Sequence, residues 1–469
     1  MQRRWKVLTL VSVGAFMVSL DLFIVNVAFP KIEADFHGSS ISSVSWVLNA
    51  YAIVLAALMV SAGRMADRHG RRRAFLAGLA IFVVGSALCG VAPSVGTLVG
   101  ARVVQAVGAA LLLPTSLALL LPEFEPVERP AAIGIWAAIG GLAAAAGPPL
   151  GGLLVQVSWR LVFLVNIPIG LAALAYGLHL LNESRDERQE RPDLLGSGLI
   201  VVGIGVLALA LVKAPAWGWG SPRAVVAFLI AFGGLAAFWR RCLTHSSPVI
   251  DPAMLRVRSF AMANLASVLF SAGFAAFLLA NVLFMTEVWH RSVLIAGLSL
   301  APGPATAAIF AASSSRYINR FGARTLSALG ISLFGIGCLW WRLRVGQVPD
   351  YAAEMLPGLL ISGVGVGLVL PSLASAASSS LPPARFGTGS AAFTMTRQVG
   401  FVLGVSILVA VLGTPGGAHP VVAFDHGWVF IIIASALGVL AALSIGVVKR
   451  APAPGEVTAS VKRRIPVRA

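Results

Sequence analysis

An aspartate and an arginine stand out because each lies deep within a long apolar stretch. Asp21 lies within residues 7–29 and Arg102 within residues 95–121. An ionisable side chain in such a stretch is costly to bury and usually marks an ion or proton pathway. At ~1.5 Å per residue of helix, Asp21 and Arg102 lie about 12 Å and about 10 Å from the outer ends of their stretches. We therefore expect them to face each other or a shared wet cavity.

Such a pair can carry a proton. A nearby cation favours the ionised carboxylate and burial favours the neutral one, so Asp21 would release or bind a proton as Arg102 approaches or withdraws. The alternative is a fixed ion pair that only holds the helices together, since structural pairs occupy similar positions. Full proton-coupled activity in an Asp21→Asn variant would exclude the first interpretation.

Other side chains within the apolar stretches are candidates for a substrate cavity. Hydrogen bonding between helices is the alternative for each amide, and packing against lipid is the alternative for the aromatic residue. The candidates are Asn26, Asn49, Gln105, Phe277 and Asn281.

A short basic segment, residues 63–73, contains five arginines between two apolar stretches. We expect it to be a loop in water, and the positive-inside rule places that water in the cytoplasm. Adding 252 to the residue numbers reproduces the segment without a gap, which predicts two related halves. The seven identities pair Arg64, Arg68, Gly70, Arg72, Gly78, Phe82 and Gly85 with Arg316, Arg320, Gly322, Arg324, Gly330, Phe334 and Gly337.

The composition indicates a polytopic membrane protein. The chain has 469 residues, of which 58% are hydrophobic and 11% charged, and its mean hydropathy is +0.89. The net charge of +17 does not indicate a nucleic-acid partner, because the basic residues separate apolar stretches and do not form one folded face. The sequence contains no GxxxxGK[ST] segment, so nucleotide binding is not predicted. The three cysteines lack the spacing of a metal site.

About 20 apolar residues can span the ~30 Å of hydrocarbon in a bilayer. Fourteen stretches reach or approach this length, and the eighth is the shortest. They are residues 7–29, 44–62, 74–92, 95–121, 131–156, 160–181, 195–212, 224–239, 260–286, 293–312, 325–341, 353–377, 387–412 and 427–448.

The basic residues between these spans predict the topology. With the amino terminus inside, 26 Lys and Arg fall in cytoplasmic segments and 7 in external ones. This bias predicts that both termini are cytoplasmic. Arg397 then lies near the cytoplasmic side of the thirteenth span, where its long side chain can reach water.

The repeat explains the number fourteen. The basic segment between spans 2 and 3 recurs between spans 10 and 11, so two helices are inserted between two six-helix bundles. We expect an all-α membrane protein whose N-terminal bundle is residues 1–182 and whose C-terminal bundle is residues 260–448. Residues 183–259 hold the linker and the inserted helices, and residues 449–469 form a disordered basic cytoplasmic tail.

The sequence resembles, over nearly its full length, the fourteen-helix drug:proton antiporters of the major facilitator superfamily. The segments that carry this resemblance are residues 20–30, 63–72, 102–108, 134–152 and 159–170. Ala106 and Ala143 stand where the motifs of spans 4 and 5 usually have glycine. Asn319 replaces the acid in the second copy of the basic segment.

The resemblance implies roles for these motifs. Arg102 belongs to the motif that is associated with proton coupling. The motif of the basic segment latches the two halves on the cytoplasmic side, and its residues here are Gly63, Asp67, Arg68, Gly70, Arg71 and Arg72.

The motif of span 5 is rich in glycine and proline, which permit close helix contact and bending. It predicts a hinge or a tight contact between the halves, and small-residue packing alone is the alternative. Its residues are Gly134, Gly147, Pro148, Gly151 and Gly152.

We expect a transporter of the cell membrane that uses the proton gradient and no cofactor. It would export amphipathic drugs or an antibiotic by alternating access between the two bundles. Export of one cellular metabolite is the first alternative, and a proton-coupled importer is a weaker one. An enzyme is not indicated, because no loop is long enough for a catalytic domain. The expected partners are the substrate, protons and lipid, and we favour a monomer. Some members of the family that the sequence resembles export multivalent cations and have an acid deep in span 10. This span has none here, so the resemblance does not favour dicationic substrates.

Overall fold

The computed structural model describes residues 2–36, 38–125, 128–185, 192–382, 385–413 and 420–446. Within these ranges the chain contains fourteen helices long and apolar enough to cross a membrane, which confirms the expected number. No strand occurs in the part of the chain that is described. The predicted tail, residues 449–469, lies outside the described ranges.

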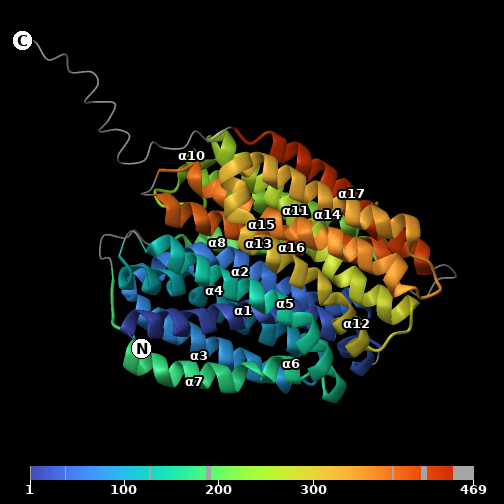
Figure 1. Cartoon of the computed structure of the whole chain (residues 1–469), viewed down its shortest axis with the longest axis horizontal. Helices are drawn as coiled ribbons and strands as arrows, with labels where there is room; N and C mark the ends of the chain where they lie inside the picture. Colours follow the sequence, from blue (N-terminus) through green and yellow to red (C-terminus); the bar gives the residue numbers. More distant parts are fainter. Residues whose placement is uncertain are drawn as a thin grey trace, which may run out of the picture.

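The first six spans form the lower half of the molecule in Figure 1. Their long helices are amphipathic only weakly, as expected when lipid and neighbouring helices are both apolar. The helices are α1 (Arg3–Asp35), α2 (Ile41–His69), α3 (Arg71–Gly90), α4 (Val95–Leu120), α5 (Arg129–Val157), α6 (Leu161–Leu164) and α7 (Asn166–Leu180).

The inserted pair and the last six spans follow. Two of these spans include a turn of π-helix, at Phe284–Val288 and Tyr351–Met355. The inserted helices are α8 (Leu194–Trp217) and α9 (Pro222–Thr244). The remaining helices are α10 (Pro252–Leu255), α11 (Arg258–Leu283), α12 (Val293–Leu300), α13 (Pro302–Phe321), α14 (Ala323–Arg344), α15 (Leu356–Ser379), α16 (Phe386–Leu412) and α17 (Pro420–Leu443).

The two halves repeat the same close helix contacts. Helix α3 packs on α4 as α14 packs on α15. A Cβ atom at Gly85 would lie 2.6 Å from the backbone of Gln105, and one at Gly337 would lie 2.5 Å from the carbonyl oxygen of Gly358. Both glycines therefore allow helix backbones to touch. These two glycines, which match at a separation of 252, serve the same packing role.

One consequence is testable at Gly108 in α4. A Cβ atom there would lie 2.5 Å from the backbone nitrogen of Phe82, whereas a Cβ atom at Gly100 in the same helix would have nothing within 4 Å. We expect Gly108→Ala to lower the stability of the purified protein by about 1–3 kcal/mol, because overpacking forces helices apart. Gly100→Ala is the matched control in a thermal unfolding assay. Equal melting temperatures for the two variants would contradict this account of the contact.

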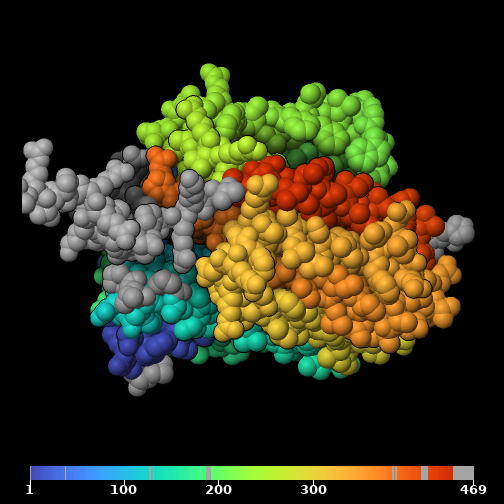
Figure 2. Space-filling model, turned by 45° about the horizontal axis from the view of Figure 1, so that its top comes forward, coloured from blue at the N-terminus to red at the C-terminus, as the bar shows by residue number. Residues whose placement is uncertain are grey.

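The halves meet along two seams. In one, α2 lies against α16; in the other, α5 lies against α12 and the start of α13. The inserted helix α8 contacts both α2 and α16, so the insertion adjoins only the first seam. Figure 2 shows the inserted pair, in green, along one edge of the molecule. The insertion thus makes the two seams unequal.

Several helix boundaries in the structure differ from those predicted from the apolar stretches. The basic segment is not a loop, because α2 continues to His69 and α3 starts at Arg71, with only Gly70 (φ +121°) between them. The eighth span is 23 residues long and is not the shortest. The last helix runs over Pro420–Leu443, several residues earlier than residues 427–448. Helices extend past the apolar stretches because charged residues are also good helix formers.

Candidate functional site

Asp21 and Arg102 form a buried ion pair between α1 and α4. Their side chains are 0% and 1% exposed, and Arg102 donates a hydrogen bond to Asp21 Oδ2. Gln105, one turn along α4, donates from Nε2 to Asp21 Oδ1 at 2.9 Å. Gln105 Oε1 in turn accepts from Arg102 at 2.6 Å. The carboxylate is therefore held by two donors that also contact each other.

Neighbouring helices fix the guanidinium of Arg102. Its Nε donates to the carbonyl oxygen of Val47 in α2 at 3.0 Å, and its Cζ atom lies 4.0 Å from the ring centroid of Tyr51. Ser86 in α3 accepts from Gln105 at 2.8 Å. Four spans of one half thus position the pair, which compensates the cost of burying two charges.

A pocket adjoins the pair at the interface of the halves. The volume that the centre of a water molecule can occupy in it is about 20 Å³. This holds water but not a drug-sized ligand. Arg102 lines the pocket and Asp21 does not. The lining residues are Leu22, Asn26, Leu48, Asn49, Ala52, Arg102, Ala275, Phe401 and Val405.

The predicted cavity residues divide into two groups. Asn26 and Asn49 line the pocket, and Asn49 donates to Ser406 of the other half at 3.1 Å. Gln105 lies behind the pocket in the network of Asp21. Phe277 and Asn281 are not among the lining residues. Phe277 stacks on Trp341 at 5.0 Å inside the C-terminal half, which is the packing alternative.

The glycines near the end of α5 lie in close contacts between helices. Cβ atoms at Gly147 and Gly151 would approach α1, the first at 2.7 Å from Phe23. A Cβ atom at Gly297 in α12 would clash with the carbonyl oxygen of Pro148, and Gly152 faces Leu294 of that helix. The motif therefore makes a tight contact between the halves.

This contact lies at the end of the molecule away from residues 64–73. We call the end that carries residues 64–73 the basic end, and the other the opposite end. A Cβ atom at Gly134, near the start of α5, would have nothing within 4 Å, so close packing does not extend to the basic end of that helix. The seam of α5 is closed at the opposite end.

The basic motif makes its contacts within itself and with the segment that links the halves. Asp67 pairs with Arg71 at 2.7 Å, and Glu183 accepts from the backbone nitrogen of Arg72 at 3.0 Å. A Cβ atom at Gly70 would lie 2.7 Å from the carboxylate of Glu183. The predicted contact of Asp67 with the other half is not among those formed by the described residues. A Cβ atom at Gly63 would lie 3.3 Å from Pro114 of α4, and Arg68 is half-buried.

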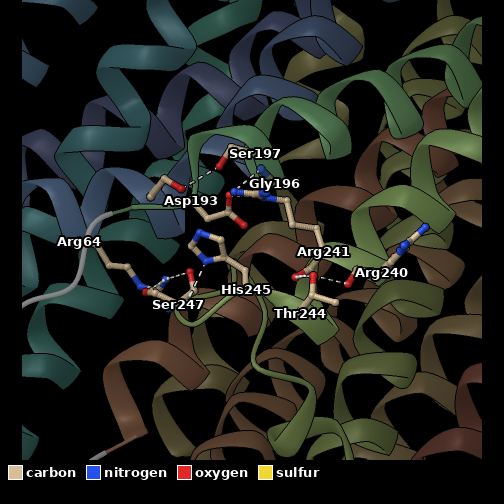
Figure 3. Close-up of polar contacts among 10 residues, drawn as sticks. Arg64, Asp193, Gly196, Ser197, Arg240, Arg241, Thr244, His245 and Ser247 are labelled. Carbon is tan, nitrogen blue, oxygen red and sulfur yellow. Dashed lines mark hydrogen bonds and ion pairs between the residues drawn. The ribbon is translucent and has the colours of Figure 1, made fainter.

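The sequence did not reveal a polar cluster that joins α2 to the inserted helices (Figure 3). Asp193 caps α8 by accepting from Gly196 at 2.9 Å, and it pairs with Arg241 of α9 at 2.6 Å. Arg64 donates to the carbonyl oxygen of Ser247 at 2.9 Å. An aspartate directly before an apolar stretch is a capping signal, which could have indicated the first contact.

Comparison with known proteins identifies the family. Residues 11–405 match the family model described as Major Facilitator Superfamily. The chain is 35% identical over 415 residues to the multidrug resistance protein Stp of Mycobacterium tuberculosis, covering 87% of this chain and 76% of that protein. It is 34% identical over 417 residues to the tetracenomycin C resistance and export protein of Streptomyces glaucescens, covering 88% and 77%.

Two further similarities cover nearly the whole chain. The cephamycin export protein CmcT of Amycolatopsis lactamdurans is 32% identical over 466 residues, covering 97% of this chain and 95% of that protein. A solved structure of a POT family transporter with a thioalcohol-conjugated peptide has a TM-score of 0.68 at 15% identity, covering 93% and 95%. The second similarity concerns the fold alone. With fourteen apolar helices and this match along its length, the chain is a multi-pass transporter of the cell membrane that belongs to the Major Facilitator Superfamily.

Proposed function

We propose that the chain exports amphipathic drugs or an antibiotic from the cytoplasm in exchange for protons. The observation that carries the proposal is the buried Asp21–Arg102 pair beside a pocket between the two halves. The names of its relatives, which are resistance and export proteins, support the direction of transport and do not favour import.

The proposed cycle uses the two halves as rocking bodies. The structure is closed at the opposite end, where Gly152 and Gly297 bring α5 and α12 together. We infer that this end faces outward and that substrate enters from the basic end in the cytoplasm. Protonation of Asp21 would weaken its pairing with Arg102, free the guanidinium that lines the pocket, and favour one orientation over the other. Such coupling requires different affinities in the two states.

Export of one metabolite is the second candidate. Two relatives are named for single compounds, tetracenomycin C and cephamycin. The small pocket also suits export of a single compound. A drug-sized molecule must push the lining residues apart to enter, and they can part for a ligand of one shape.

Proton-driven uptake into inside-out vesicles tests the proposal. The full-length protein is expressed, and a panel of neutral, monocationic, anionic and dicationic dyes is added with and without a proton gradient. We expect concentrative uptake of some dyes, substrate-induced proton release, and no response to dicationic dyes. If no dye responds while the purified protein remains folded, broad drug export is excluded and a single-metabolite exporter is favoured.

A further inference from the structure

Arg397 in α16 is a buried cation that the proposed cycle does not use. Its side chain is half-buried, and its Nε atom is shielded from solvent and has no hydrogen-bond partner. None of the described carboxylates forms an ion pair with it. An unpaired guanidinium within a membrane span is costly, so it is normally met by water, by another group or by a ligand.

Arg397 lies well inside its helix. It lies eleven residues after the start of α16 (Phe386–Leu412), a distance of about 16 Å along a helix axis. This exceeds the length of an arginine side chain. That Arg397 reaches water at the edge of the membrane stays a prediction.

The helix places Arg397 on the approach to the pocket. At 3.6 residues per turn, Ser390, Thr394, Arg397, Phe401 and Val405 lie on one face of α16. Phe401 and Val405 line the pocket beside Arg102. Along this face Ser390 is exposed, the next three residues are half-buried and Val405 is buried. Exposure along this face thus falls from the basic end toward the pocket.

Adjacent faces of α16 are occupied by neighbouring helices. Gly400 and Gly404 touch the backbone of α11, where Cβ atoms would clash with the carbonyl oxygens of Val268 and Ala272. Another face, which includes Met395, packs in the core shared with α2 and α8. Between these two contacts lies the side of α16 that carries Phe401 and Val405 and lines the pocket between the halves. Arg397 stands at the edge of this side, one turn from Phe401.

No unpaired acid stands among the described residues of the helices around Arg397. In these residues, α4, α5, α11, α13 and α15 contain no Asp or Glu, and neither does α1 before Asp21. Asp67 of α2 is paired with Arg71, and Asp193 at the start of α8 is paired with Arg241. The charge of Asp21 is already met by Arg102. Gln398, next to Arg397, also has a buried side-chain oxygen without a partner. Arg397 therefore brings an uncompensated positive charge, beside an unused polar group, to a position one helical turn from the pocket.

We propose that Arg397 binds an anionic group, such as a carboxylate or phenolate, of the molecule that the protein exports. The guanidinium can hold a carboxylate through two parallel hydrogen bonds. The apolar part of the same molecule then extends toward Leu22, Ala275 and Phe401 in the pocket. This inference rests on the proposed export function and specifies its substrate class as amphipathic acids.

The test compares an amphipathic dye that carries a carboxylate with its uncharged methyl ester. Binding to the full-length protein is measured in vesicles of phosphatidylcholine, for the wild type, Arg397→Met, Arg397→Lys and Arg240→Met. Arg240 is exposed on α9 and serves as the matched control. We expect the wild type to bind the acid about 10- to 100-fold more tightly than the ester, the range for a charged hydrogen bond. Arg397→Met should lose this preference and Arg397→Lys should keep part of it.

The outcomes separate this inference from the export function. If Arg397→Met prefers the acid as strongly as the wild type, the inference is overturned. Unchanged binding of the ester shows that Arg397→Met is folded. If Arg397→Met is not folded, the ratio of acid to ester affinity in Arg397→Lys and Arg397→Gln decides the role of Arg397. If no dye is transported with protons, the export function fails, whereas the binding ratio still decides the role of Arg397.

An anionic lipid headgroup presents the same chemistry as an acidic substrate. The binding assay is therefore repeated in vesicles that contain phosphatidylglycerol. We expect little change in the affinity for the acid. If phosphatidylglycerol displaces the acid from the wild type, and Arg397→Met is insensitive to this lipid, the ligand of Arg397 is a lipid and the assignment to exported substrate is overturned.

Discussion

Asp21→Asn is expected to abolish concentrative, proton-driven transport while downhill movement of substrate persists. A proton that crosses ~100 mV releases about 2.3 kcal/mol. At ~1.4 kcal/mol per factor of ten, one proton can sustain an accumulation of about 40-fold for a neutral substrate. Asparagine has a similar shape but cannot carry the proton, so the accumulation ratio should fall to one. The ratio is measured with a dye in inside-out vesicles.

The hydrogen bonds around Asp21 predict a second effect of this substitution. Both oxygens of Asp21 accept, one from Arg102 and the other from Gln105. The amide of asparagine brings a donor against one of these donors, whichever way it is turned. We therefore expect a modest loss of thermal stability besides the loss of coupling. Asp21→Glu, which retains a titratable group, is the matched control and should keep partial accumulation.

Two results would contradict this role of Asp21. Unimpaired accumulation in Asp21→Asn would make the pair a structural one, held only for packing. If downhill transport and accumulation are both lost, the substitution blocks the substrate path itself. Because Asp21 does not line the pocket, the second result would also require a different view of the pocket.

The membrane spans and the ion pair could be predicted because their signals are local and strong. Long apolar stretches have few explanations, and a charge within one is rare enough to draw attention. Asp21 and Arg102 also lie at matching depths. Their contact could therefore be predicted on the single assumption that the two side chains face each other. The repeat at a separation of 252 fixed the order of helices, and its glycines pack alike in both halves.

The remaining features depend on which way a side chain faces. Arg397 and Arg102 have the same side chain in the same kind of stretch, yet only the second has an acid within reach. The sequence makes Phe277 a candidate for lining the substrate cavity, but it packs on Trp341 within one half. Hydropathy could not show that α2 continues through the basic segment to His69, because charge and helix formation are independent properties.

The close contact at the opposite end predicts a reversible block of transport. A Cβ atom at Gly152 would lie 3.2 Å from the Cα atom of Leu294. Cysteines at these two positions are close enough to form a disulfide, which needs Cα atoms within about 7 Å. The native Cys89, Cys242 and Cys338 are buried and should not compete. We expect oxidation of the Gly152→Cys/Leu294→Cys variant to stop transport and a reducing agent to restore it.

The block follows from alternating access, because substrate can leave at the opposite end only if α5 and α12 separate there. Either single cysteine variant, treated with the same oxidant, should retain transport and so controls for the substitutions themselves. A band of altered mobility after partial proteolysis would report the cross-link independently of activity. Full transport by the cross-linked protein would mean that this seam stays closed during the cycle. The halves would then have to part along α2 and α16, the seam that the inserted helix α8 adjoins, and the insertion would have to move with every turnover.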